Sequence, residues 1–109
     1  MSHAEYMEQL QQDVGRVAAA ALSGNLDNLE ACWLLGPLLA QAELSPDDLD
    51  ANAIGQVCSE LDALPIGEAR ALWSSHTLGR LAPELEALKS WALPLAMPAI
   101  QSAAARFGI

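Results

Sequence analysis

Helix-forming residues dominate this chain. Its 109 residues include 21 alanines and 19 leucines, whereas valine, isoleucine and threonine together number only eight. Alanine and leucine have favourable helix propensities, and the β-branched residues that favour strands are scarce. The composition therefore predicts an all-α fold. Because the length suits one hydrophobic core, we expect residues 1–109 to form a single-domain compact bundle.

Caps and apolar spacing predict about five to six helices, several of them short and interrupted by proline. Ser2, followed three residues later by a glutamate, fits a capping box, so a first helix is expected from about residue 3 to 22. The nearly continuous apolar run over residues 29–40 is typical of a helix that is buried on most sides. Since Pro37 cannot donate a backbone hydrogen bond, the Gly36-Pro37 pair should kink this helix or split it.

The strongest helix start in the sequence is the Ser-Pro-Asp-Asp run over residues 45–48. Ser45 is suited to the N-cap, Pro46 to the first helical position, and two carboxylates would lie beside the positive end of the helix dipole. This third helix should end before Pro65. Its expected apolar face consists of Leu49, Ala53, Val57, Leu61 and Leu64.

Prolines divide the carboxy-terminal part of the chain. A fourth short helix is expected over about residues 67–75, and leucines at helical spacing then continue across Pro83, which lies inside a helix or begins a new one. Pro94 and Pro98 should break or bend the chain. A last short helix over about residues 98–107 should place three side chains in the core, those of Ile100, Ala104 and Phe107.

The negative charge is concentrated in one part of the sequence. Residues 17–69 contain nine carboxylates and no lysine or arginine, and the other residues hold five acids and five bases, so this stretch carries the whole net charge of −9. A surface of one sign attracts partners of the opposite sign and repels nucleic acid and anionic membranes. We therefore expect a protein partner with a basic surface, no nucleic-acid partner and no membrane partner. The alternative is that the acids only keep the protein in solution. The expected contact residues are Glu43, Asp47, Asp48, Asp50, Glu60 and Asp62.

Three tryptophans, Trp33, Trp73 and Trp91, lie in apolar contexts that favour packing in the core. The alternative for Trp91 is that it anchors an interface, because it stands near the start of an uncharged stretch of sixteen residues, 90–105. This stretch is shorter than the roughly 20 residues that span a bilayer. It predicts self-association through Trp91 to Phe107.

Neither a metal site nor a catalytic site is predicted. The run from Asp48 has the D-x-D-x-N start of a calcium-binding EF-hand loop, but Ala53 stands at position six, where glycine is needed, and Ser59 at position twelve, where glutamate is needed. His3 and His76 have no carboxylate or cysteine at a spacing of four residues, so neither a metal pair nor a nucleophile-base pair is supported. We expect a protein without a cofactor that is not an enzyme.

The cysteines and the amino terminus indicate the cellular compartment. Cys32 and Cys58 are 26 residues apart, which is no metal-binding spacing, and both are expected to be reduced and buried. The first residues lack the basic start and apolar run of a secretory signal, so a cytoplasmic location is expected.

These observations predict a non-enzymatic helical interaction domain that binds or masks a basic surface of a partner protein, in a regulatory, adaptor or immunity-like role. A first alternative is a homo-oligomeric structural or accessory subunit of a larger complex. A second is a small helical domain with an apolar ligand pocket lined by tryptophan and leucine side chains. No sequence motif assigns the chain to a family.

Overall fold

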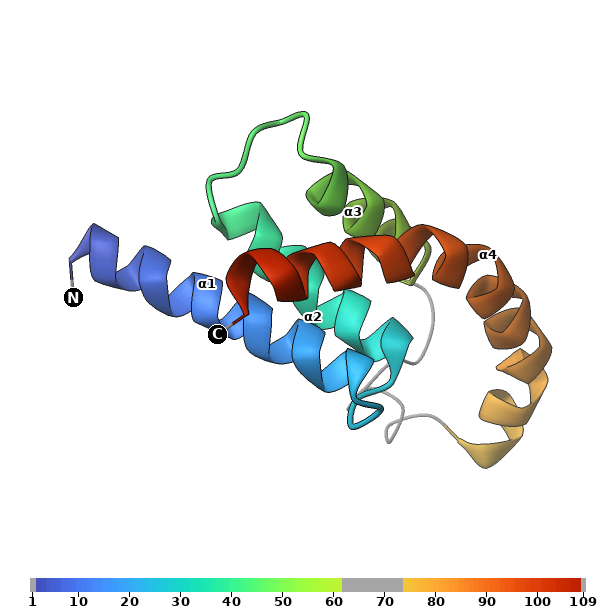
Figure 1. Cartoon of the computed structure of the whole chain (residues 1–109). Coiled ribbons are helices and arrows are strands. Elements are labelled where there is room, and N and C mark those ends of the chain that lie inside the picture. Colours follow the sequence, from blue (N-terminus) through green and yellow to red (C-terminus); the bar gives the residue numbers. More distant parts are fainter. Residues whose placement is uncertain (1, 62–73, 109) are drawn as a thin grey trace.

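The computed structural model describes residues 2–61 and 74–108, and within them the chain forms four α-helices (Figure 1). Helices hold 84% of the described residues, and none of these residues lies in a strand. The prediction of an all-α fold is confirmed. The prediction of five to six helices is not matched in the described part of the chain, where the helices are α1 (His3–Leu22), α2 (Asn28–Gln41), α3 (Leu49–Leu61) and α4 (Ser75–Phe107).

Most of the difference in helix number arises in α4. The separate helices expected before and after the prolines form one helix of 33 residues that contains Pro83, Pro94 and Pro98. Figure 1 shows this helix curving without interruption. Each proline removes one hydrogen bond and favours a bend. Burial of Ala92, Ala96 and Ala99 favours a continuous helix around Pro94 and Pro98, whereas residues 75–84, which include Pro83, contain no buried residue. The helix expected over residues 67–75 lies outside the described residues, except that Ser74 caps α4 and Ser75 begins it.

The Gly36-Pro37 pair likewise does not split α2, which is continuous from Asn28 to Gln41. The side chain of Asp27 caps this helix by accepting the backbone N–H of the residues two and three positions later, at 3.1 and 3.2 Å. Gly36 has a packing role: a Cβ atom there would lie 2.5 Å from Cys58 Sγ of α3. The missing side chain therefore lets α3 approach α2 closely.

The predicted start of α3 at Ser45 is wrong by about three residues. Residues 45–48 form a turn in which Ser45 O accepts the N–H of Asp48 at 2.9 Å and Ser45 Oγ accepts the N–H of Asp47 at 3.2 Å. Asp48 is the residue that caps α3, since its Oδ1 accepts the N–H of Ala51 at 3.0 Å. The expected apolar face is confirmed in part: Val57 and Leu61 are buried and Ala53 is half-buried, whereas Leu49 is 82% exposed. Ile54 is also buried, and Leu64 lies outside the described residues.

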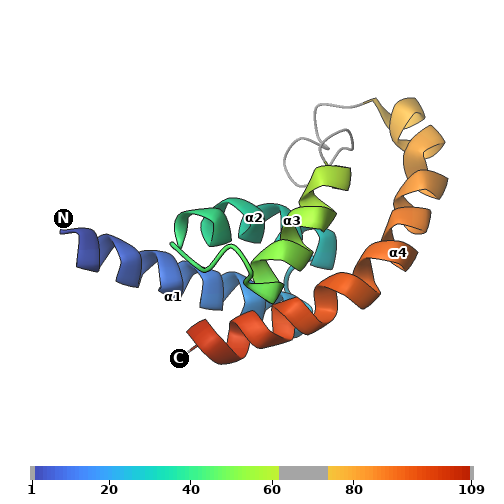
Figure 2. The same cartoon turned by 90° about the horizontal axis from the view of Figure 1, so that it is seen from above.

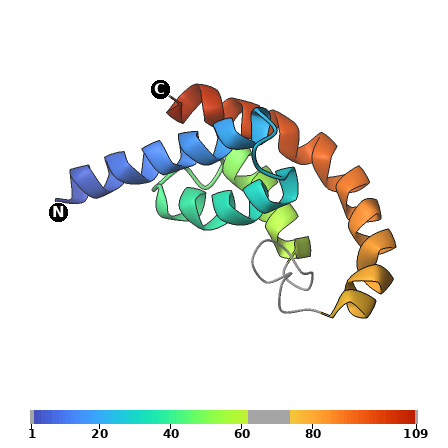
Figure 3. The same ribbon diagram turned by 90° about the horizontal axis from the view of Figure 1, so that it is seen from below.

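A single cluster of buried side chains draws on all four helices. The carboxy-terminal half of α4 runs beside α1 in the opposite direction and also packs on α3 (Figure 2, Figure 3). Gly15 of α1 permits this approach, because a Cβ atom there would collide with the backbone of Phe107. The largest fully buried side chains are those of Val14, Leu29, Leu35, Ile54, Val57, Leu61 and Ile100.

Of the helices that the structure describes, none combines the length and apolar character needed to cross a membrane.

Candidate functional site

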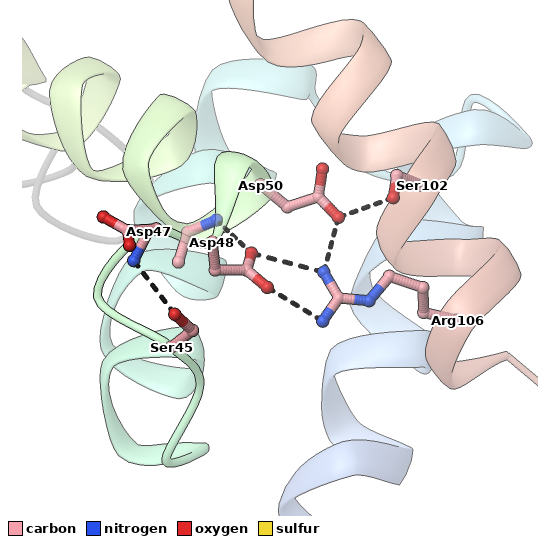
Figure 4. A network of polar contacts seen from close by, with 7 residues as sticks. Ser45, Asp47, Asp48, Asp50, Ser102 and Arg106 are labelled. Carbon is pink, nitrogen blue, oxygen red and sulfur yellow. Dashed lines mark hydrogen bonds and ion pairs between the residues drawn. The ribbon is translucent and has the colours of Figure 1, made fainter.

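Arg106, near the end of α4, binds two of the carboxylates predicted to contact a partner (Figure 4). Its Nη2 donates to Asp48 Oδ2 at 2.9 Å, and its Nη1 donates to Asp50 Oδ2 at 2.7 Å and to Asp48 Oδ1 at 3.2 Å. Ser102, one turn earlier on α4, donates its hydroxyl to Asp50 Oδ2 at 2.5 Å. We call these four residues the Arg106 cluster. It joins the end of α4 to the start of α3.

The Arg106 cluster is partly shielded from water. The side chains of Asp48 and Asp50 are each 13% exposed and that of Arg106 is 36% exposed. The hydrogen bonds from Arg106 hold the pKa of Asp48 below its usual value, and those to Asp48 and then Asp50 raise the pKa of Arg106. Charge-assisted bonds with two acceptors are among the stronger hydrogen bonds in proteins. The single positive charge of Arg106 thus offsets part of the two negative charges of Asp48 and Asp50, which weakens the argument that they are available to a partner.

The other predicted contact carboxylates are spread along the acidic stretch. Glu43 adopts a left-handed backbone conformation, with φ at 56°, just after α2, and its carboxylate lies 3.3 Å from His3 Nε2. Asp47 is exposed in the turn before α3, whereas Glu60 is exposed near the other end of that helix, roughly 15 Å away along its axis. Asp62 lies outside the described residues. The structure therefore groups Glu43 and Asp47 around the connection between α2 and α3 and leaves Glu60 apart.

The structure also shows a surface groove whose position the sequence did not predict, although tryptophan and leucine side chains line part of it, as in the apolar-pocket alternative. This groove, with a volume of about 890 Å³, lies over α2 between α1 and α3. We call it the α2 groove. Its floor includes Trp33, Leu34 and Pro37 of α2, and its sides include Val17 of α1 and Gly55 of α3. The side chains that line it are predominantly apolar.

The α2 groove exists because α2 is not buried on most sides, contrary to the prediction. Trp33 and Leu34 are 40% and 42% exposed, so Trp33 is not a core residue either. The buried residues recur every three or four positions and define one face. Trp33, Leu34 and Pro37 fall on the opposite face. The buried residues at this spacing are Leu29, Cys32, Leu35 and Leu39.

Trp91 is also outside the core, and its side chain is 48% exposed on α4. The other face of the segment from Trp91 to Phe107 is buried against the rest of the protein, through Ala92, Ala96, Ala99, Ile100 and Ala103. Self-association through this segment would therefore depend chiefly on Trp91 and stays a prediction. The third tryptophan, Trp73, lies outside the described residues.

Both cysteines are thiols at the contact between α2 and α3. Cys58 Sγ donates to Cys32 O at 2.9 Å. Burial, as the largest cause, raises the pKa of the Cys32 thiol to about 12. Because the thiolate is the nucleophilic form, this pKa makes Cys32 a poor nucleophile. Cys32 is buried as expected, whereas Cys58 is only half-buried at the edge of the α2 groove.

The described histidines lie on different helices, His3 in the first turn of α1 and His76 in the first turn of α4. Within residues 2–61 and 74–108, no three histidine, cysteine or acidic side chains are grouped as metal ligands would be.

Comparisons of the chain with protein-family models, with curated proteins and with solved structures give no match.

Proposed function

We propose that this protein is a non-enzymatic interaction domain that binds a partner protein carrying a basic surface. The observation that carries the proposal is the charge of residues 17–69, which include α2 and α3 and hold nine carboxylates without a lysine or arginine. Arg106 offsets part of the charge of Asp48 and Asp50, but Glu43, Asp47 and Glu60 remain exposed. Binding would mask the basic surface of the partner.

The exposed carboxylates act first on the rate of encounter. A one-signed field steers an oppositely charged partner toward the surface and accelerates association more than it deepens the final affinity. Salt shortens the reach of this field to about 8 Å at physiological ionic strength. The association rate constant should therefore fall steeply as salt is added.

The test compares two triple variants that change the net charge equally. One replaces three exposed carboxylates among residues 17–69, and the control replaces three exposed carboxylates elsewhere. Association with a purified partner is followed by surface plasmon resonance at low and at physiological salt. The first variant is Glu43→Gln with Asp47→Asn and Glu60→Gln, and the control is Glu5→Gln with Glu8→Gln and Glu84→Gln.

We expect the first variant to slow association at least roughly threefold at low salt and the control to change it by less than about half as much. Equal effects of the two variants would mean that only the total charge matters. A partner that has a neutral or acidic contact surface and associates independently of salt would refute the proposal.

A second candidate is a homo-oligomeric subunit, and the observation that favours it is the exposure of Trp91 on α4. A large exposed aromatic side chain is a typical interface anchor. Light scattering at micromolar concentration distinguishes a dimer from a monomer of 11.5 kDa. A dimer that Trp91→Ala dissociates would support this candidate, and a monomer in both proteins would remove it.

A further inference from the structure

We propose that the α2 groove is the docking site for an amphipathic helix of the partner, with an apolar face and basic residues on its other side. This inference rests on the proposed function, because it names the element of the basic partner that makes the contact. The proposed docking site would give the protein an apolar contact with the partner in addition to the contact made by its acidic surface.

The exposed apolar side chains supply the first argument. Trp33 and Leu34 are adjacent in sequence, both are about two-fifths exposed, and Pro37 lies one turn further along the same face of α2. Apolar side chains gathered in a surface hollow gain free energy when a partner removes them from water. Tryptophan is also among the residues that contribute most to binding in protein interfaces.

The shape of the α2 groove suits a helix. Its floor on α2 runs from Trp33 to Ala40, which corresponds to about 10 Å of helix axis or two turns. Gly55 lines it without a side chain, and because an added Cβ there would meet no atom within 4 Å, the groove stays open beside α3. A partner helix would place apolar residues at positions i, i+3, i+4 and i+7 along such a groove.

Glu30 of α2 and the net charge of the protein favour a basic helix over an acidic one. Glu30 precedes Trp33 by three residues and Leu34 by four, so it lies on the same face of α2. On α1, Asp13 and Arg16 both line the groove and pair with each other at 3.1 Å, so their charges offset each other. A second copy of this chain would carry the same net charge of −9 and would be repelled, as would an anionic membrane. Lysine or arginine on the polar side of a partner helix is favoured.

The test uses three synthetic peptides of about 14 residues as probes. The first contains leucine and lysine, with leucines at helical spacing on one face. The second has the same composition in an order that creates no apolar face. The third has the spacing of the first, with glutamate in place of lysine. Binding is measured by isothermal titration calorimetry at low salt.

Two variants fill or charge the α2 groove, and each has a matched control. Gly55→Leu places a side chain in the groove, where an added Cβ meets no atom within 4 Å, and Gly79→Leu does the same on the exposed surface of α4. Leu34→Glu adds a charge to the groove, and Leu22→Glu adds one at a site of equal exposure, 43%, outside it. Because glycine is a poor helix former, Gly55→Leu should fold at least as well as the unchanged protein. Melting curves by circular dichroism check this.

We expect the first peptide to bind most tightly, with its affinity lowered at least roughly tenfold by Gly55→Leu and by Leu34→Glu and changed less than about twofold by the controls. Equal binding of the first peptide to the Gly55→Leu variant would refute the docking site. Equal, salt-sensitive binding of both lysine peptides would also refute the docking site while leaving the proposed function intact.

Two outcomes would refute the docking site and the proposed function together. These are binding of the glutamate peptide as tight as that of the first peptide, and no binding of either lysine peptide. A dimer in light scattering that Gly55→Leu dissociates would mean that a second copy occupies the groove, which also refutes the inference.

Discussion

Arg106 Nη2 lies 2.9 Å from Asp48 Oδ2, and this ion pair joins two residues that are 58 positions apart in the sequence. Asp48 also caps α3 through its other oxygen, Oδ1, which accepts the N–H of Ala51. One carboxylate therefore defines where α3 begins and where the end of α4 packs. This link gives Asp48 a structural role that is separate from any contact with a partner.

Replacing Arg106 should destabilise the fold. In Arg106→Gln, two carboxylates that are each 13% exposed lose their counter-charge, and we expect the free energy of unfolding to fall by about 1 to 3 kcal/mol. Urea denaturation followed by circular dichroism measures this change. The control is Arg16→Gln, because Arg16 forms a largely exposed pair with Asp13 and should contribute less than about 1 kcal/mol. Equal effects of the two substitutions would contradict the structural role of the Arg106 cluster.

The same ion pair should make stability depend on acid pH. Arg106 lowers the pKa of Asp48 in the folded state below the value near 4 that is usual for an unfolded chain. Stability from this carboxylate is therefore fully present above about pH 4 and is lost as the pH falls through the lower, folded pKa. Urea midpoints between pH 7 and pH 3 should decline less steeply for Asp48→Asn than for the unchanged protein. Parallel declines would mean that Asp48 does not contribute to the acid sensitivity.

The helical class and the first helix could be predicted because their causes are local. Alanine and leucine favour helices in any context, and the bond from Glu5 N–H to Ser2 Oγ, at 3.1 Å, links residues three positions apart. The start of α3 has a different cause. Ser45 and Asp48 are both good caps, and the side chain that holds Asp48 comes from Arg106 on α4. A sequence signal confined to residues 45–48 therefore cannot show whether Ser45 or Asp48 caps α3.

The exposed face of α2 could be predicted only in part. The run over residues 29–40 is apolar on nearly all sides, so its composition does not show which side other helices cover. The packing of α1 and α3 on either side decides that Trp33 and Leu34 stay exposed. The continuity of α4 through Pro94 and Pro98 is favoured in the same way by burial of one face against other helices.

The capping and the pairing roles of Asp48 can be separated by two substitutions. Asp48→Asn keeps a side chain that can cap α3 but loses the charge, whereas Asp48→Ala loses both functions. We expect the alanine variant to be less stable than the asparagine variant by about 1 kcal/mol in urea denaturation. Asp47→Asn is the neighbouring control and should change stability by less than about 0.5 kcal/mol, because the Asp47 side chain is exposed. Equal stability of the two Asp48 variants would mean that the cap is unimportant.

Gly36 and Gly55 should respond in opposite directions to alanine. In Gly36→Ala the new Cβ atom would lie 2.5 Å from Cys58 Sγ, so either the Cys58 side chain rotates and loses its hydrogen bond to Cys32 O, or α2 and α3 separate. Stability should fall by about 1 to 3 kcal/mol. In Gly55→Ala the Cβ atom meets nothing within 4 Å, and the higher helix propensity of alanine should stabilise the protein by up to about 1 kcal/mol.

Removing Cys58 Sγ tests whether its contact with the new Cβ atom causes the loss of stability in Gly36→Ala. Cys58→Ala should be destabilising alone, but Gly36→Ala should cost less in the Cys58→Ala background than in the unchanged protein, with a coupling energy of about 0.5 to 3 kcal/mol in urea denaturation. If the two effects simply add, the contact between Gly36 and Cys58 is not what brings α2 and α3 together.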